Sequence, residues 1–187
     1  MSRCLWPGND PTYLDYHDNE WGLPEYCSGA LFEKLVLDGF QAGLSWITIL
    51  KKRENFREAF ADFNAHTISS WTNTEVDKLL QNKGIIRHRG KIEAAITNAQ
   101  AYLRIEHREG FDNFLWNYVS GKPLVNNWMH ASEVPAQTCL SKQISLDLKK
   151  EGFKFCGPTI VYAFMQATGI VNDHLIGCFC HNICQKY

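Results

Sequence analysis

The sequence predicts an all-α fold with roughly eight to ten helices of ordinary length. Apolar residues recur at intervals of three and four along most of the chain, which is the spacing of one helix face. No stretch shows sustained apolar and polar alternation bounded by hairpin turns, which would indicate strands. Glycine and proline mark helix ends without dividing the chain into two self-sufficient cores. We therefore expect a single domain over residues 1–187.

The first helices are predicted from capping residues followed by apolar faces. Asp10 before Pro11 is typical of a helix start, because aspartate caps free N–H groups and proline fits the first turn. This short helix ends near residues 20–22. Ser28 is placed to cap a second helix. Its inward face would be formed by Leu31, Phe32, Leu35 and Val36, and residues 46–63 should form two further helical pieces.

The second half continues with helices around one polar connection. Asn73 or Thr74 is placed to cap a helix that runs to Asn82, and a long helix should follow a turn and reach about residue 104. Residues 111–119 predict a short helix, and residues 122–140 a connection without clear period. The remaining helical segments are expected at residues 141–150 and 159–168, with one or two turns over residues 172–180.

Composition places the chain among globular proteins of a reducing compartment. The start of the sequence has no apolar stretch typical of an export signal, and the apolar run at residues 159–171 is too short to span a membrane. The cysteine count of seven is odd, which favours reduced thiols or metal ligands over a disulfide framework. A net charge of −1 counts mildly against nucleic-acid binding, although local basic clusters remain.

The stretch from Asp38 to Trp46 is the candidate ligand site. It holds a carboxylate, two glycines and a tryptophan, and a tryptophan face with a nearby acid suits a flat cationic ligand. Taken alone, the stretch is more typical of a helix corner with a solvated Asp38 and a core Trp46, because carboxylates are mostly exposed. Tyr13, Tyr16 and Trp21 lie in the same part of the sequence and favour an aromatic pocket.

The turn at residues 83–92 is the candidate DNA contact. It combines Gly84, the apolar Ile86 and the basic Arg87 and Lys91 between two predicted helices. Free N–H groups at the start of the second helix, together with the positive charge, suit phosphate binding. A helix-hairpin-helix element over about residues 74–104 would hold the DNA backbone without reading its sequence. The alternative is an ordinary two-helix corner with basic residues on its surface.

Cysteine and histidine residues near both ends form a candidate metal site. Cys4 and His17 lie in residues 1–20, and His174 and Cys178 lie in residues 170–187, where a spacing of four would place them on one helix face. Two thiolates and two imidazoles make a closed tetrahedral zinc set. Spacing alone leaves other ligands open, since six further residues compete: Cys27, Cys139, Cys156, Cys180, His181 and Cys184.

Taken together, these motifs resemble the 3-methyladenine DNA glycosylase I family. The resemblance lies in residues 16–22, 41–46, 84–92 and 171–174 with Cys178, in the family's order. It implies an all-α fold of the helix-hairpin-helix DNA glycosylase type, with one structural zinc joining the two ends. The implied ligands are Cys4, His17, His174 and Cys178. The implied base pocket consists of Tyr16, Trp46 and the acidic position 38, with Tyr13 and Trp21 nearby.

The resemblance also implies a function in base-excision repair. The expected enzyme is a monofunctional glycosylase that releases free 3-methyladenine from double-stranded DNA, as a monomer in a bacterial cytoplasm. Asp38 would act on the base, and the backbone around Gly43 and Leu44 would enter the gap left by the extruded nucleotide. The family's usual glutamate is replaced by Asp38, one methylene shorter. Residues 96–103 contain no aspartate, so they lack the catalytic acid of many superfamily members.

The charge of the damaged base explains how such an enzyme works without that acid. N3-methyladenine is cationic in DNA, so its glycosidic bond is weak and the departing base is neutral. The base is rotated out of the duplex, Trp46 and Tyr16 would stack on it, and Asp38 would accept its N–H groups. Two rival functions remain, a non-catalytic zinc-stapled DNA-binding module and a zinc hydrolase. The second is disfavoured because four protein ligands leave no position for a water.

Overall fold

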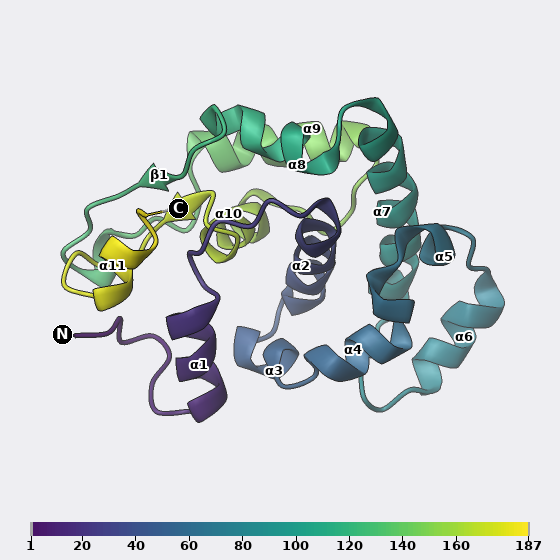
Figure 1. The fold of residues 1–187 in the computed structure, drawn as a ribbon. Helices are drawn as coiled ribbons and strands as arrows, with labels where there is room; N and C mark the ends of the chain where they lie inside the picture. Colours follow the sequence, from purple (N-terminus) through teal and green to yellow (C-terminus); the bar gives the residue numbers. More distant parts are fainter. Residues whose placement is uncertain (1, 187) are drawn as a thin grey trace.

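The computed structural model describes residues 2–186 and consists mainly of helices joined by short turns (Figure 1). The α-helices are α1 (Pro11–Asn19), α2 (Ser28–Gln41), α3 (Trp46–Leu50), α4 (Arg53–Ala59), α5 (Ala65–Ser69), α6 (Asn73–Gln81), α7 (Arg89–Arg108), α8 (Phe111–Trp116), α9 (Cys139–Glu151), α10 (Pro158–Ala167) and α11 (Phe179–Ile183). The 3-10 turns are η1 (Ala61–Phe63), η2 (Asn117–Val119) and η3 (Ala131–Glu133). The predicted all-α fold is therefore confirmed.

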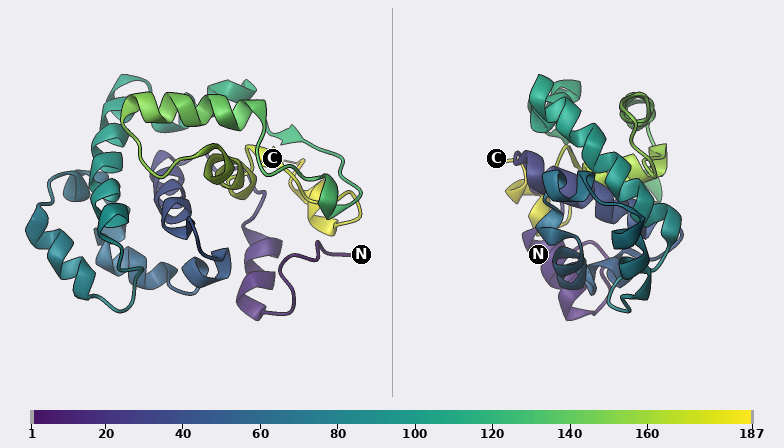
Figure 2. Two further views of the ribbon diagram at one scale, coloured as in Figure 1. Left: turned by 180° about the vertical axis from the view of Figure 1, so that it is seen from behind. Right: turned by 90° about the vertical axis from the view of Figure 1, so that its right-hand side faces the viewer.

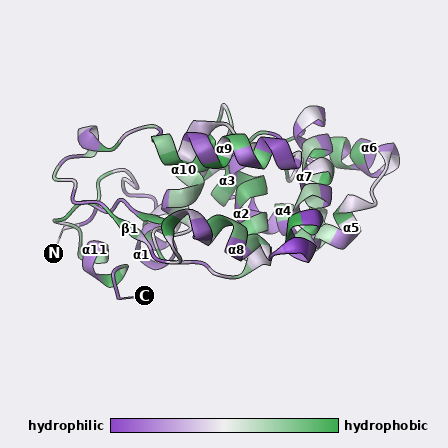
Figure 3. Ribbon diagram, turned by 90° about the horizontal axis from the view of Figure 1, so that it is seen from above, coloured by the Kyte–Doolittle hydropathy of each residue, from purple (hydrophilic) through white to green (hydrophobic). Residues whose placement is uncertain are grey.

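Helix α2 lies at the centre and makes contacts with α3, α7, α8 and α10. Its apolar residues, among them Leu31, Phe32 and Leu35, are almost completely buried. Figure 3 shows hydrophobic residues gathered along α2 and α10 in the middle of the molecule. Burying these side chains contributes about 2 kcal/mol each. The core thus fixes α2, which carries Asp38 near its C-terminal end.

Short helices and a row of phenylalanines form the part of the molecule beyond α2. Phe40 packs against Phe56 with ring centroids 4.8 Å apart, and the stack continues through Phe60 to Phe63. Helix α5 packs against α7, and α6 also contacts α7. The two further views in Figure 2 show α7 beside the short helices of this part of the molecule. This packing holds the turn between α6 and α7 at one edge of the molecule.

Several helix boundaries differ from the prediction because a neighbouring residue caps the helix. Thr72, and not Asn73 or Thr74, caps α6 in a capping box with Glu75. Thr138 caps α9, which begins at Cys139. Ser28 is the first residue of α2 and not its cap. Helix α7 continues to Arg108, one turn beyond the expected end.

The predicted connection at residues 122–140 contains a short strand that the sequence pattern did not indicate. Strand β1 (Leu124–Val125) pairs in parallel with β2 (Val171–Asn172), with Leu124 opposite Val171. Two residues are too few for alternation to be visible in sequence. The pairing places the connection beside the C-terminal segment, which follows α10.

The two ends of the described chain lie side by side (Figure 1). Ser2 and Cys178 form an isolated parallel bridge, and the Phe179 amide donates to the Ser2 carbonyl at 3.1 Å. Among the described residues, every helix falls short of the length and apolar character needed to cross a bilayer.

Gly169, which follows α10, lies against the link between α1 and α2. Its φ of +68° is strained for other residues, and a Cβ there would come within 2.4 Å of the Leu23 carbonyl carbon. The Glu25 amide also donates to the Thr168 carbonyl at 3.0 Å. The α1–α2 link is therefore held against the end of α10.

Candidate active site and metal centre

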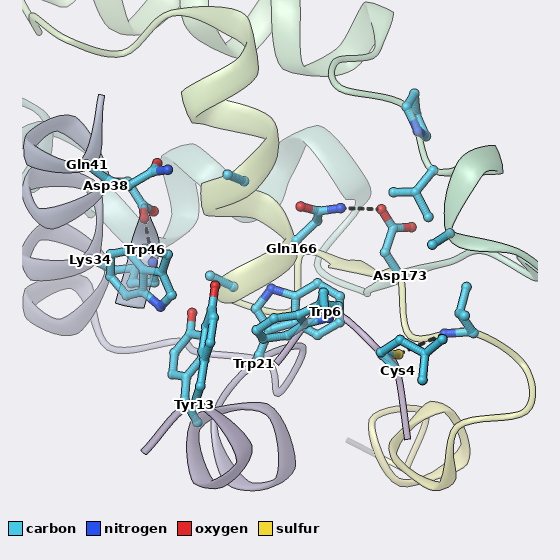
Figure 4. A pocket seen from close by; sticks show the side chains of 18 residues that line it. Cys4, Trp6, Tyr13, Trp21, Lys34, Asp38, Gln41, Trp46, Gln166 and Asp173 are labelled. Atoms are coloured by element: carbon cyan, nitrogen blue, oxygen red, sulfur yellow. Dashed lines mark hydrogen bonds and ion pairs between the residues drawn. The ribbon is translucent and has the colours of Figure 1, made fainter. Parts of the chain in front are cut away.

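A cavity of about 440 Å³ opens between α1, α2, α3 and α10 (Figure 4). Helix α1 contributes Tyr13 and Tyr16, and α3 begins with Trp46. Helix α2 contributes Asp38, and Trp21 comes from the segment after α1. All five predicted pocket residues therefore line one cavity.

Aromatic rings form one wall of the cavity. Tyr16 is buried and lies 5.6 Å from Trp46 between ring centroids. Trp6 contacts both Tyr13 and Trp21, with centroids 4.8 Å and 5.1 Å apart. Burial raises the pKa of Tyr16 well above its ordinary value, so its hydroxyl stays protonated at neutral pH. The wall offers flat apolar faces on which a ring can stack.

Asp38 is a buried carboxylate with one oxygen in use. The side chain is 3% exposed, and Lys34 Nζ donates to Oδ1 at 2.6 Å. Its second oxygen, Oδ2, is buried and has no hydrogen-bond partner among residues 2–186, and the same is true of Trp46 Nε1. Unpaired buried polar atoms are rare in folded proteins, and a bound ligand or an ordered water supplies the partner. The interpretation of Asp38 as a solvated corner residue is wrong.

Lys34 is a pocket residue that the sequence analysis missed. Its ammonium lies 3.6 Å from the centre of the Trp46 ring, within cation–π distance. Burial lowers the pKa of Lys34 and raises the pKa of Asp38, while the attraction between the two groups opposes both shifts. Their spacing of four residues on α2 was the available signal, because it places them on one helix face.

Asp173 is a second buried carboxylate beside the cavity, and it too was missed. Tyr162 and Gln166 donate to Oδ2 at 2.6 and 2.8 Å, and Asn126 and Trp128 donate to Oδ1 at 2.7 and 2.8 Å. Figure 4 shows Gln166 and Asp173 joined across the cavity from Asp38. Asp173 thereby fixes α10, the β1 segment and the chain before His174 in one arrangement.

The corner after α2 is open to solvent. Gly43 has a φ of +82°, which glycine adopts without strain, and Leu44 is 40% exposed. Gln41 Nε2 donates to the Leu44 carbonyl at 3.1 Å and steadies the corner. An apolar side chain is thus presented outward next to the cavity, as predicted for a residue that enters DNA.

Lys91 does not take the predicted position at the DNA surface. It is only 7% exposed, and its ammonium donates to the Phe40 carbonyl at 2.8 Å and to the Ala42 carbonyl at 2.5 Å. These carbonyls end α2, where helical carbonyls have no partners of their own. Lys91 therefore holds the corner beside Asp38, and a contact with DNA does not fit this placement.

The turn between α6 and α7 is held from within and exposed at its tip. Ile85 is buried, and Lys52 donates to the Gly84 carbonyl at 3.1 Å. A Cβ at Gly84 would lie 3.0 Å from Asn82 Oδ1 and 3.1 Å from Asn55 Cβ, so the residue has little room. Arg87 is exposed at the start of α7.

The four predicted metal ligands meet at one point although they are far apart in sequence. The ligand atoms of Cys4, His17, His174 and Cys178 all lie within 4.8 Å of one another, and all four residues are buried. Cys178 Sγ lies 3.6 Å from both His17 Nε2 and His174 Nδ1. Tetrahedral zinc with ordinary bond lengths requires a sulfur–nitrogen separation of about 3.6 Å. The geometry therefore fits zinc.

The remaining ring nitrogens of the two histidines are also engaged. His17 Nδ1 lies 2.8 Å from an Asp18 carboxylate oxygen, and His174 Nε2 lies 2.9 Å from the Trp21 carbonyl. Such partners fix the ring orientation of metal-binding histidines. The pKa of the Cys178 thiol is strongly lowered by hydrogen bonds from Cys4 and the two histidines, which favours the thiolate that metals require.

The helical interpretation of residues 172–180 is wrong for residues 172–178, and helix α11 begins only at Phe179. Residues 173–178 form a turn and a bridge between β2 and α11, so His174 and Cys178 are brought together by chain reversal and not by helical spacing. Among the competing residues, Cys180 lies next to this cluster, in a second group with His17 and Asp18. His181 instead lies 2.9 Å from the Asn126 carbonyl through Nε2.

Comparison with known proteins places this arrangement in a family. The family model for methyladenine glycosylase matches residues 6–181. The chain belongs to the methyladenine glycosylase family. The chain is 52% identical over 182 residues to DNA-3-methyladenine glycosylase 1 of Escherichia coli K12, with 97% of each chain covered. It is also 52% identical over 180 residues to the DNA-3-methyladenine glycosylase of Haemophilus influenzae, with 96% of this chain and 97% of the relative covered.

Solved structures support the same assignment for this methyladenine glycosylase. A crystal structure of a 3-methyladenine DNA glycosylase I is similar with a TM-score of 0.95 and 52% identity, covering 96% of this chain and all of the other. The Staphylococcus aureus 3-methyladenine DNA glycosylase I, studied for its recognition of 3-methyladenine, has a TM-score of 0.93 and 44% identity, with 96% of both chains covered. The resemblance to this family is confirmed.

Proposed function

We propose that this protein hydrolyses the N-glycosidic bond of 3-methyladenine in alkylated DNA and leaves an abasic site. The observation that carries the proposal is the unpaired Asp38 Oδ2, buried beside Trp46 in a cavity of about 440 Å³. Such a cavity is of the size that takes a small ring compound. The named relatives, all DNA-3-methyladenine glycosylases, support the same reaction.

The pocket residues act on a base that has been rotated out of the duplex. Trp46 and Tyr16 stack on its ring, and Asp38 Oδ2 accepts a hydrogen bond from an N–H group of the base. The cationic base is held by the tryptophan face and by the carboxylate. Water attacks the sugar carbon, and the bond electrons leave with the base. Because the base starts with a positive charge, it departs neutral and needs little activation.

We also propose that the cluster of Cys4, His17, His174 and Cys178 holds one structural zinc ion. The sulfur and nitrogen spacing, the burial and the carbonyl and carboxylate partners of the histidines support this proposal. Zinc bound by four protein ligands joins segments and keeps no open position for a catalytic water. Its role here is to staple the two ends of the chain, which disfavours a zinc hydrolase.

DNA is expected to meet the turn at residues 82–88 and the corner at Gly43 and Leu44. The turn would act as a helix-hairpin-helix element, in which Gly84 allows close approach, Ile86 packs inward and Arg87 faces phosphate. Leu44 is exposed where an extruded nucleotide would leave a gap. The monomeric state and the cytoplasmic location stay predictions.

Release of free bases from methylated duplex DNA, resolved by chromatography, tests the reaction. The wild-type protein should release 3-methyladenine, and Asp38→Asn and Trp46→Ala should release far less while still folding. Asp38→Glu measures what the shorter acid costs in this pocket. If the folded wild-type protein binds DNA but releases no base, the glycosylase proposal fails and the non-catalytic DNA-binding module replaces it.

A further inference from the structure

We propose that Lys34 is a specificity-determining residue that lowers the preference of the pocket for a cationic base over a neutral one. Its ammonium pairs with Asp38 and lies over the Trp46 ring, so the cavity favours a cationic base over a neutral adenine-type ring less strongly than it would without Lys34. The inference rests on the proposed base-binding function of this cavity, and it goes beyond that function by assigning the charge state of the preferred ligand.

The geometry places a resident cation where a charged base would bind. Lys34 and Asp38 lie four residues apart on α2, and Nζ is 2.6 Å from Oδ1. The same nitrogen lies 3.6 Å from the centre of the Trp46 ring. The Lys34 side chain is 16% exposed and the Asp38 side chain 3%. The pair is therefore largely shielded from water. Charge interactions are stronger in such a site than in water.

Two other acidic groups near the pair already have partners, one through an ion pair and one through hydrogen bonds. Glu20 forms its own ion pair with Arg53, with Nη1 and Oε2 2.5 Å apart. Asp173, on the opposite side of the cavity, accepts hydrogen bonds from four neutral donors, which hold its carboxylate in position. Lys34 therefore balances the charge of Asp38, its ion-pair partner.

This balance changes which ring fits best. A cationic ring that stacks on Trp46 meets the Lys34 ammonium, which costs repulsion unless the lysine moves away. A neutral adenine ring presents an N–H donor and a nitrogen acceptor on adjacent positions of one edge. The donor can bind the free Asp38 Oδ2, and the acceptor can bind one of the remaining N–H groups of Lys34. A neutral ring can thus use both members of the pair without charge repulsion, whereas a cationic ring that presents the same edge is repelled by the Lys34 ammonium.

Calorimetric binding of two small ligands at pH 8 tests the proposal apart from catalysis. One ligand is 3-methyladenine as the neutral free base. The other is 3,9-dimethyladeninium, in which the second methyl group takes the place of the sugar and the ring keeps its positive charge. Lys34→Met removes the ammonium, and Lys34→Gln removes the charge but keeps a donor for Asp38. Base release by wild type from methylated DNA is measured in parallel.

The expected result is a change in the ratio of the two affinities. Relative to wild type, Lys34→Met or Lys34→Gln should favour the cationic ligand over the neutral one by about tenfold to a hundredfold. The double variant Lys34→Met with Asp38→Asn removes both charges and should return the ratio towards wild type. Lys150→Met is the matched control, since Lys150 also pairs with a nearby aspartate on one helix but does not line the cavity, and its ratio should not change.

The outcomes separate this inference from the proposed function. If wild type releases 3-methyladenine from DNA and the affinity ratio of both folded Lys34 variants stays within twofold of wild type, Lys34 does not determine specificity. A wild-type protein that binds neither ligand also overturns the inference. If wild type releases no base but the ratio shifts as expected, the charge assignment holds and the glycosylase reaction fails.

Discussion

Replacing Lys91 by methionine should weaken the fold without reducing the electrostatic part of DNA binding. The Lys91 ammonium donates to the carbonyls of Phe40 and Ala42 at the end of α2, and the first bond is buried and the second partly buried. Hydrogen bonds from a charged group contribute about 1.5–3 kcal/mol each. Because burying the ammonium itself costs free energy, we expect a net loss of about 3 kcal/mol, which lowers the melting temperature by about 6–12 °C.

Arg87→Met provides the matched comparison on the same turn. Each phosphate contact contributes about 0.9 to the slope of the logarithm of DNA affinity against the logarithm of salt concentration. Arg87 is exposed, so its loss should reduce that slope by about 0.9 and leave the melting temperature nearly unchanged. Fluorescence anisotropy with a duplex at several salt concentrations measures the slope. If Lys91→Met reduces the slope as much as Arg87→Met and melts like wild type, the structural role of Lys91 is refuted.

Three further predictions concern buried polar groups. Asp173→Asn should lower the free energy of unfolding by about 3 kcal/mol, because the amide nitrogen that replaces one carboxylate oxygen would face hydrogen-bond donors. Asp77→Asn, at a side chain that is 64% exposed, should cost about 1 kcal/mol or less in the same denaturant titration. Burial raises the pKa of Asp38, so the rate of base release should fall as the pH decreases, at a pH above the ordinary aspartate pKa of about 3.9. Asp38→Asn should lack this acidic limb of the pH–rate profile. A limb at or below a pH of about 3.9 contradicts the assignment to Asp38. Metal analysis should find about one zinc per chain. Cys178→Ser or a chelator should remove the zinc and lower the melting temperature. An unchanged melting temperature after complete zinc removal contradicts the stapling role.

Local sequence signals predicted the elements well because their causes lie within one turn of the helix. Asp10 caps α1 through bonds to the Thr12 and Tyr13 amides, as its place before Pro11 predicts. The apolar spacing of α2 was equally clear, because that face meets the core along its length. The α6 cap was misplaced by one residue because Thr72, Asn73 and Thr74 are all good capping residues, and only Thr72 reaches Glu75 as a partner.

Tertiary placement accounts for most of what sequence reasoning missed. Lys91 follows basic residues and a glycine, and this pattern favoured a phosphate contact. Its side chain instead points to a carbonyl group at the end of α2, 51 residues earlier in the sequence. Asp173 takes two partners from α10, 11 and 7 residues earlier, and two from the distant residues 126 and 128, and no sequence pattern indicates that these donors meet it. Lys34 was visible through its spacing from Asp38, yet its position over Trp46 depends on how α3 packs against α2.

The contact between Gly169 and the Leu23–Pro24 backbone has a consequence for ligand binding. It fixes the distance between α10 and the start of the chain that carries Tyr13 and Tyr16, and any larger side chain would separate them. The walls of the cavity are thus preorganised, so little conformational entropy remains to be lost when a ring enters. Discrimination among bases then depends on which nucleotides leave the duplex and fit the preformed cavity. It does not depend on the cavity walls closing around the ligand.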